Sequence, residues 1–246
     1  MRGVVTARKS PTVGHPKADP AGRLTSETGI NIPEVFERLF AVNGKQRWWP
    51  GDSAFEIMVG AVLTQNTAWT NVKRAIANLI QARALSPEVI VRAHPRRLGK
   101  WLRPSGYFNV KARRLKAMCR WLIGAGGIRK ITRTPTHELR RALLGVHGIG
   151  PETADDILLY AFNRPVFVID AYTRRIFSRL GLIKGSEKYE SLRQSFEKVL
   201  EPDAQKLNEF HALIVVHGKN ICKKKPRCQM CVLASGCSSS IAHSSC

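Results

Sequence analysis

The fold is decided by one stretch of the sequence, Leu143-Leu144-Gly145-Val146-His147-Gly148-Ile149-Gly150-Pro151-Glu152-Thr153-Ala154-Asp155. An apolar helix is expected to run into the pattern Gly-x-x-Gly-x-Gly, and Pro151 can then open a second helix. Glycines at 148 and 150 allow a tight turn whose N–H groups approach a phosphate, while the next helix N-terminus adds partial positive charge. The segment predicts a helical hairpin that grips a nucleic-acid backbone, although an ordinary helix–helix turn also fits this motif taken alone.

Dinucleotide-binding folds also place glycines before a helix, but there the glycine loop follows a strand. The segment from Leu139 to Leu144 has helical periodicity, so this alternative is excluded by context.

Helical periodicity continues through the rest of the chain from Ile32 onward, and strand-like alternation is nearly absent. Pro87, Pro95 and Pro135 each occupy a plausible first helical position. Ser186 is predicted to cap a later helix and Gly218 to end the one after it. We therefore predict an all-α fold of about ten helices and no sheet.

Charge is the strongest compositional signal, with 40 Lys and Arg against 18 Asp and Glu and a formal net charge of +22. From Arg92 to Arg141 the chain has 15 basic residues and one acid, Glu138. This bias favours a polyanionic partner, and nucleic acid before a membrane surface. The 43% apolar content excludes disorder of the whole chain. Residues 1–30 have almost no large apolar side chains and are expected to form a disordered basic tail.

No stretch approaches the roughly 18 consecutive apolar residues of a membrane helix, and residues 1–30 lack the apolar core of a secretory signal. A cytoplasmic protein that binds no membrane is therefore expected, associated with the nucleoid if it is prokaryotic.

Four cysteines near the C-terminus, Cys222, Cys228, Cys231 and Cys237, have the spacing C-x5-C-x2-C-x5-C, which leaves Cys119 and Cys246 as singles. In a chain without a secretion signal, four clustered thiols favour a metal centre over disulfides. One central C-x2-C with wider flanks fits a cubane cluster, but the spacing alone fits structural zinc about equally well.

Taken together, these motifs resemble those of the helix-hairpin-helix DNA glycosylases of the endonuclease III superfamily. The resemblance covers roughly residues 31–237 and is carried by Leu144–Gly150, by Val168-Ile169-Asp170-Ala171-Tyr172 and by the four cysteines. It implies a six-helix barrel lobe at residues 52–164 and an iron–sulfur lobe at residues 31–51 and 165–237, with a cleft between them. Residues 238–246 would form a flexible tail.

The resemblance also implies roles for individual residues. Asp170 would be catalytic, and the four cysteines would hold a [4Fe-4S] cluster, although the common family spacing has one more residue in the first gap. The hairpin, including Gly145, Val146, Gly148 and Gly150, would hold DNA phosphates, often through a monovalent cation. Either Gln65 or Asn66 would fill the gap left by the extruded base.

The sequence around Asp170 is compatible with that role. Asp170 ends the apolar run from Val166 to Ile169 beside Arg174 and Arg175, where a carboxylate could sit at the edge of a cleft, though a lone Asp there is commonly a helix cap.

One departure from the family pattern concerns strand cleavage. Bifunctional relatives have a catalytic lysine in the first turn after the hairpin, and this chain has Glu152 there. A carboxylate cannot form a Schiff base with the sugar. The chain looks similar to the monofunctional branch related to 3-methyladenine DNA glycosylase III.

We expect a monomeric base-excision-repair N-glycosylase that acts on duplex DNA with a damaged base, alkylated bases included, or a mispaired base. Two alternatives stay open: a bifunctional glycosylase and AP lyase that uses another amine, and a catalytically silent iron–sulfur DNA-binding protein.

Overall fold

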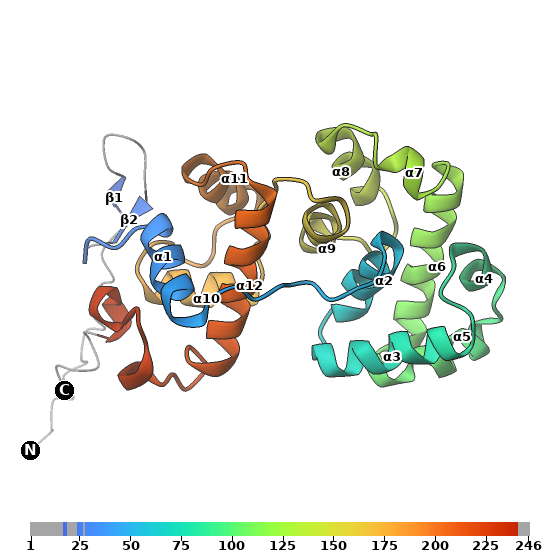
Figure 1. Cartoon of the computed structure of the whole chain (residues 1–246), viewed down its shortest axis with the longest axis horizontal. Coiled ribbons are helices and arrows are strands. Elements are labelled where there is room, and N and C mark those ends of the chain that lie inside the picture. Colours follow the sequence, from blue (N-terminus) through green and yellow to red (C-terminus); the bar gives the residue numbers. More distant parts are fainter. Residues whose placement is uncertain (1–16, 19–23, 27, 241–246) are drawn as a thin grey trace, which may run out of the picture.

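The computed structural model describes residues 17–18, 24–26 and 28–240, and over these residues the fold is all-α, as predicted (Figure 1). One detail of the prediction is wrong. Lys17–Ala18 (β1) and Leu24–Thr25 (β2) form an antiparallel pair, whereas no sheet was expected. Strands of two residues are too short to build a layer. Ser26 and residues 28–30 of the predicted disordered tail are also described, and the prediction is wrong for them: Ile30 is buried in the core, and Thr28 donates to the carbonyl oxygen of Gly236 at 2.8 Å. Residues 1–16, 19–23, 27 and 241–246 lie outside the described residues.

The helices form two lobes, seen side by side in Figure 1. The hairpin lobe consists of α2 (Ala54–Thr64), α3 (Trp69–Gln81), α4 (Pro87–Arg92), α5 (Pro95–Leu102), α6 (Phe108–Gly124), α7 (Ile128–Ile131), α8 (Thr136–Leu144) and α9 (Pro151–Asp156). The cysteine lobe consists of α1 (Ile32–Asn43), α10 (Ala171–Arg179), α11 (Tyr189–Val199), α12 (Ala204–Asn220) and the C-terminal loop. The chain crosses between the lobes twice, after α1 and before α10.

Most helix starts follow the local signals in the sequence. Ser86 and His94 cap α4 and α5 with their side chains, and Pro87 and Pro95 take the first helical positions. Pro135 is itself the cap of α8, which begins at Thr136, one position later than predicted. The prediction for Ser186 is wrong: α11 begins after Lys188 and has no side-chain cap.

Gly218 does not end a helix, because α12 continues through it to Asn220. Its function is close packing between α12 and α10. A Cβ atom at Gly218 would lie 2.4 Å from Cδ1 of Tyr172, so only glycine lets the two helices approach this closely.

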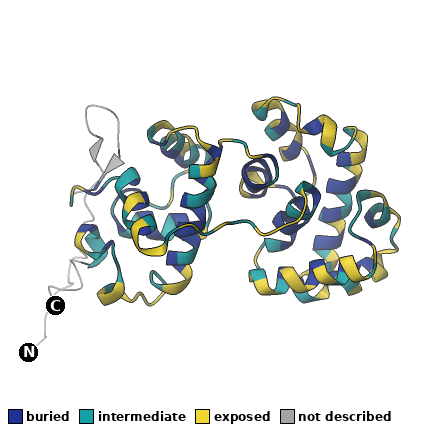
Figure 2. Ribbon diagram, in the orientation of Figure 1, coloured by how far each residue is buried: buried dark blue, intermediate teal, exposed yellow. Residues whose placement is uncertain are grey.

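The second hairpin helix lies in the middle of the molecule. After Asp156, α9 continues as a π-helical turn, Ile157–Ala161, which packs against α2 and is almost entirely buried (Figure 2). Asp155, fully buried on α9, accepts two hydrogen bonds from Arg140 of α8, at 2.7 and 3.0 Å. It also accepts one from the hydroxyl of Tyr189 on α11, at 2.9 Å. This network fixes the hairpin to the cysteine lobe, since removal of one partner would leave a buried charge uncompensated.

Within the described residues, no helix is long and apolar enough to cross a bilayer.

Candidate active site and metal centre

The hairpin loop between α8 and α9 contains two glycines that act differently. Gly148 has φ +85°, and a Cβ atom there would lie 2.2 Å from Cγ of Arg114, so both the turn and its packing require glycine. Gly150 has φ −92°, and a Cβ atom there would meet nothing within 4 Å. The expectation that both glycines are needed to form the turn is therefore wrong for Gly150. What Gly150 provides is bare backbone at the N-terminus of α9, open to close approach by a ligand.

The rest of the loop is anchored to the interior. Gly145 is the C-cap of α8 with φ −75°, and the Val146 side chain is buried. The two residues thus position the loop, and whether their backbone also contacts DNA stays a prediction.

The end of α2 lies against this hairpin. The Gln65 amide donates to the carbonyl oxygen of Gly148 at 3.0 Å and to Oγ1 of Thr153 at 2.9 Å, and its oxygen accepts from Arg114. Asn66, next in the chain, is exposed and has φ +55°. Both residues line a cavity beside the hairpin. Gln65 is held in place by three hydrogen bonds and Asn66 is exposed, but which of them fills the gap in the DNA stays a prediction.

Asp170 is both a helix cap and part of a pocket. Its Oδ1 accepts hydrogen bonds from the backbone N of Thr173 at 2.7 Å and from Oγ1 of Thr173 at 2.9 Å, which makes it the N-cap of α10. The two arginines beside it in sequence do not pair with it. Arg174 donates to backbone oxygens of Gly185 and Glu187, and Arg175 to those of Gly218 and Cys222.

The residue that faces Asp170 is His211 of α12. Nε2 of His211 lies 3.6 Å from Oδ2 of Asp170, and Nδ1 is hydrogen-bonded to the hydroxyl of Tyr160. Burial acts to raise the pKa of Asp170, but the interactions with His211 and Thr173 outweigh it and lower the pKa below its usual value. His211 was not predicted, because in sequence it is one polar residue on the apolar face of a helix.

A pocket of about 460 Å³ lies between the lobes, with Asp170 and His211 in its wall. This volume is within the range that accommodates small ligands. Its aromatic wall consists of Trp48, Trp49, Trp69 and Tyr172, and its charged groups are Glu152, Asp156, Asp170 and Lys219. The tryptophans, Asp156 and Lys219 come from segments far apart in the chain, and sequence analysis did not identify them as site residues.

Three carboxyl groups share this pocket. Glu152 is exposed at its mouth, where the surrounding protein and the charge of Asp170 raise its pKa. Asp156 is buried, and burial together with Glu152 and Asp170 raises its pKa well above the usual value. The pocket therefore favours different protonation states for its carboxyl groups. The ionised form is favoured at Asp170, and the protonated form is favoured at Glu152 and Asp156 relative to a free carboxyl group.

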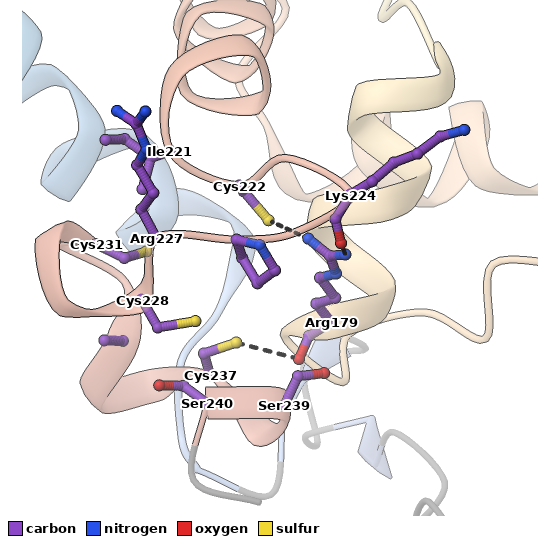
Figure 3. Close-up of a pocket in the computed structure, with 12 residues that line it drawn as sticks. Arg179, Ile221, Cys222, Lys224, Arg227, Cys228, Cys231, Cys237, Ser239 and Ser240 are labelled. Atoms are coloured by element: carbon purple, nitrogen blue, oxygen red, sulfur yellow. Dashed lines mark hydrogen bonds between the residues drawn. The ribbon is translucent and has the colours of Figure 1, made fainter. Parts of the chain in front are cut away.

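The four predicted metal ligands line one cavity in the C-terminal loop, of about 160 Å³ (Figure 3). Arg179 of α10 donates to Sγ of Cys222 at 3.2 Å, and its carbonyl oxygen lies 3.3 Å from Sγ of Cys237. Cys119 is buried in the hairpin lobe, away from this cavity, and Cys246 lies outside the described residues. In the described part of the chain, no group of three or more His, Cys, Asp or Glu side chains is arranged so that it could hold a metal ion. The [4Fe-4S] cluster therefore stays a prediction.

Comparison with known proteins gives consistent results. Residues 59–202 match the family described as HhH-GPD superfamily base excision DNA repair protein. A Methanocaldococcus jannaschii protein described as a DNA repair glycosylase is 43% identical over 209 residues, which cover 84% of this chain and 95% of the relative. An endonuclease III of Sulfolobus acidocaldarius is 29% identical over 187 residues, 75% of this chain and 82% of the relative.

Solved structures share the fold. An endonuclease III in a non-covalent complex with DNA has a TM-score of 0.74 at 20% identity, covering 86% of this chain and 95% of that one. A 3-methyladenine DNA glycosylase of H. pylori, bound to 1,N6-ethenoadenine, has a TM-score of 0.65 at 31% identity, covering 75% of this chain and 97% of that one.

Proposed function

The chain belongs to the HhH-GPD superfamily of base excision DNA repair proteins, and we propose that it is a monofunctional DNA glycosylase that removes alkylated purines from duplex DNA. The observation that carries this proposal is Asp170, a carboxylate with a lowered pKa in the wall of a ligand-sized interlobe pocket. Similarity to the H. pylori 3-methyladenine glycosylase supports the choice of alkylated purines.

The position of Asp170 supports a role in glycosidic cleavage. Breaking the bond between base and sugar produces positive charge on the sugar, and a fixed carboxylate stabilises that charge. Thr173 holds Oδ1, so Oδ2 is the oxygen left to face the reacting sugar or the attacking water. Because the site is already organised by the N-terminus of α10, little rearrangement is needed when charge develops.

The lining of the pocket favours a base that carries positive charge. Alkylation at a ring nitrogen makes a purine cationic and a better leaving group. Cations are attracted to the faces of aromatic rings, and to carboxylates, and this pocket offers Trp48, Trp49, Trp69 and Tyr172 beside its acids. A flipped purine could stack on these rings, which would offset part of the cost of unstacking it from DNA.

Glu152 supports the absence of strand cleavage, because a carboxylate at this position cannot attack the sugar as the lysine of bifunctional relatives does. Within the described lining of the pocket there is one amine, Lys219, whose pKa burial lowers. Lys219 is therefore the nucleophile to test for the bifunctional alternative.

Duplex DNA is the proposed partner, held by the hairpin around Gly148 and Gly150 and by the basic residues of α5, α6 and α8. The cluster proposed for Cys222, Cys228, Cys231 and Cys237 would be [4Fe-4S]; when bound it would fold the C-terminal loop and hold its lysines in place. Iron and zinc contents of protein made with ample iron test this assignment. The monovalent cation at the hairpin and the monomeric state stay predictions.

The function is tested by single-turnover release of bases from duplexes that each carry one lesion or mismatch. Release of alkylated purines by the wild type is expected, and Asp170→Asn should lower its rate by at least roughly 100-fold with little loss of DNA affinity, because it removes charge stabilisation and leaves the phosphate contacts. No release from any duplex would favour the catalytically silent alternative.

Borohydride trapping tests the second part of the proposal. The wild type should form no covalent adduct with DNA, and Glu152→Lys should form some. Strong trapping by the wild type that disappears in Lys219→Met would establish the bifunctional alternative instead.

A further inference from the structure

The interlobe pocket contains a carboxyl group that the proposed reaction does not use. Asp156 lies at the end of α9, one helical turn after Glu152, and is only 8% exposed. It lines the pocket and has no hydrogen bond or ion pair with any residue that the structure describes. Buried polar side chains are normally paired. An unpaired carboxyl group in the wall of a ligand-sized pocket indicates that its partner is the ligand.

One further polar atom in the same pocket points to a ligand. Nε1 of Trp49 is buried and has no hydrogen-bond partner among the described residues. Trp49 packs edge-to-face against Trp69, which also lines the pocket, with ring centroids 4.9 Å apart. An aromatic lining with unpaired polar groups suits a hydrogen-bonding heterocycle.

We infer that Asp156 selects the base, by pairing its carboxyl group with the donor–acceptor edge of an extruded adenine. This inference rests on the proposed function and narrows it from alkylated purines to alkylated adenines. Adenine presents an N6 amino donor beside the N7 acceptor, whereas guanine presents two acceptors, O6 and N7. A neutral carboxylic acid has one donor and one acceptor side by side, which matches adenine and opposes guanine.

The surroundings of Asp156 favour the neutral acid. Burial raises its pKa well above the usual value, and the nearby carboxyl groups of Glu152 and Asp170 raise it further. Asp170 receives the hydrogen bonds of Thr173 and faces His211, and Asp156 receives none of these. The surroundings thus favour the ionised form of Asp170 and the protonated form of Asp156, which can donate a hydrogen bond.

The test measures which purine is released from duplex DNA treated with methyl methanesulfonate, which contains 3-methyladenine and 3-methylguanine in one sample. These two bases carry the methyl group on the same ring nitrogen and differ in the edge that Asp156 would contact. Released bases are separated by chromatography under single-turnover conditions for the wild type, Asp156→Ala and Asp156→Asn. The amide of Asn keeps one donor and one acceptor at nearly the same volume.

We expect the wild type to prefer 3-methyladenine. Asp156→Ala should lower the ratio of 3-methyladenine to 3-methylguanine release by roughly 10- to 100-fold, the usual value of a bidentate contact. Asp156→Asn should keep the ratio within about threefold of the wild type, and since it preserves the shape of the side chain it also controls for folding.

The other outcomes distinguish failure of the proposed function from failure of the role inferred for Asp156. If the wild type releases neither base, the proposed function is wrong, and the inference fails with it. If the wild type releases purines and Asp156→Ala leaves the ratio unchanged, even with both rates lowered, Asp156 does not select the base while the proposed function stands. Loss of the ratio in Asp156→Asn would overturn the donor–acceptor pairing.

Discussion

Lys111 places an ammonium group in the interior of the hairpin lobe. The side chain is 1% exposed, and Nζ donates to the backbone oxygens of Leu63 at 2.9 Å and Ser105 at 2.6 Å. Leu63 is in the last turn of α2, where a positive charge satisfies a carbonyl that has no partner within the helix. Burial, with a smaller contribution from Arg114, lowers the pKa of Lys111 to about 8. The lysine therefore joins α2 to the segment before α6. Burial of its charge lowers the free energy of unfolding.

That cost predicts a pH dependence of stability. Between about pH 8 and the unfolded pKa of about 10.5, Lys111 is protonated in the unfolded chain and not in the folded one, so its contribution to the free energy of unfolding rises with pH. Below pH 8 both states are protonated and the cost is fully present. Relative to Lys111→Met, the wild type should gain roughly 3 kcal/mol in free energy of unfolding as the pH rises across this window. Urea unfolding at each pH measures it, because all other titrating groups are common to both proteins. Parallel curves would show that Lys111 titrates normally.

Asp170 shows why two interpretations of one residue need not compete. It caps α10, as a lone Asp after an apolar run commonly does, and it also lines the pocket. The capping bonds from Thr173 use one carboxylate oxygen and leave the other directed at His211. The helix end thus fixes the position of the carboxylate, while His211 and Thr173 together lower its pKa, as the proposed reaction requires.

At the level of elements, the two glycines of the hairpin turn have different functions, one in folding and one in binding, which the sequence pattern cannot distinguish. Gly148 is required by its positive φ and by the close approach of Arg114, so it maintains the folded turn. Gly150 has an ordinary φ and open space around it, so its lack of a side chain matters only to a bound partner.

Alanine substitutions test this separation. Gly148→Ala should lower the free energy of unfolding by at least about 1–2 kcal/mol, since the left-handed conformation alone costs this much. Gly150→Ala should leave stability unchanged or slightly higher, yet weaken binding to undamaged duplexes of any sequence by about tenfold, which corresponds to roughly 1.4 kcal/mol. Urea unfolding and fluorescence anisotropy provide the two measurements. Unchanged affinity in Gly150→Ala would mean that phosphates do not approach this part of the loop.

Helices were predictable from sequence because their signals are local. Ser86 and His94 followed by proline mark helix starts within a few residues, and the predicted starts agree with the structure there. The prediction for Gly218 was wrong because its role depends on Tyr172, 46 positions earlier in the chain. His211 and Asp156 were missed for the same reason: only tertiary packing, and no local sequence signal, places each of them in the pocket wall. Asp170 and the four cysteines could be identified because each belongs to a local motif.

Over the whole molecule, the basic residues of both lobes bear on one partner. The strongly basic segment from Arg92 to Arg141 lies in the hairpin lobe, from α4 to α8. A second basic group, with Lys224, Lys225 and Arg227 exposed, lies in the cysteine loop of the other lobe. Arg179 fixes the backbone of that loop by donating to the carbonyl oxygens of Lys223 and Lys224, at 2.6 and 3.0 Å. We expect a duplex bound across both lobes to contact both basic regions.

This arrangement predicts how DNA binding depends on salt. Each phosphate neutralised by Lys or Arg releases counterions, so the logarithm of the affinity should fall linearly with the logarithm of salt concentration, with a slope of roughly −4 to −7 if five to eight phosphates are contacted.

If the cysteine loop binds DNA, replacing both Lys224 and Lys225 with Gln should reduce the slope by about one unit for each phosphate that is no longer neutralised, equally for all sequences. Replacing Lys198 and Lys206, on α11 and α12 and outside the loop, with Gln provides the control of matched charge. Anisotropy titrations of an undamaged duplex between about 50 and 200 mM salt measure both slopes. A loop variant that behaves as the control would confine the DNA contacts to the hairpin lobe, and a nearly flat slope in the wild type would argue against DNA as the partner.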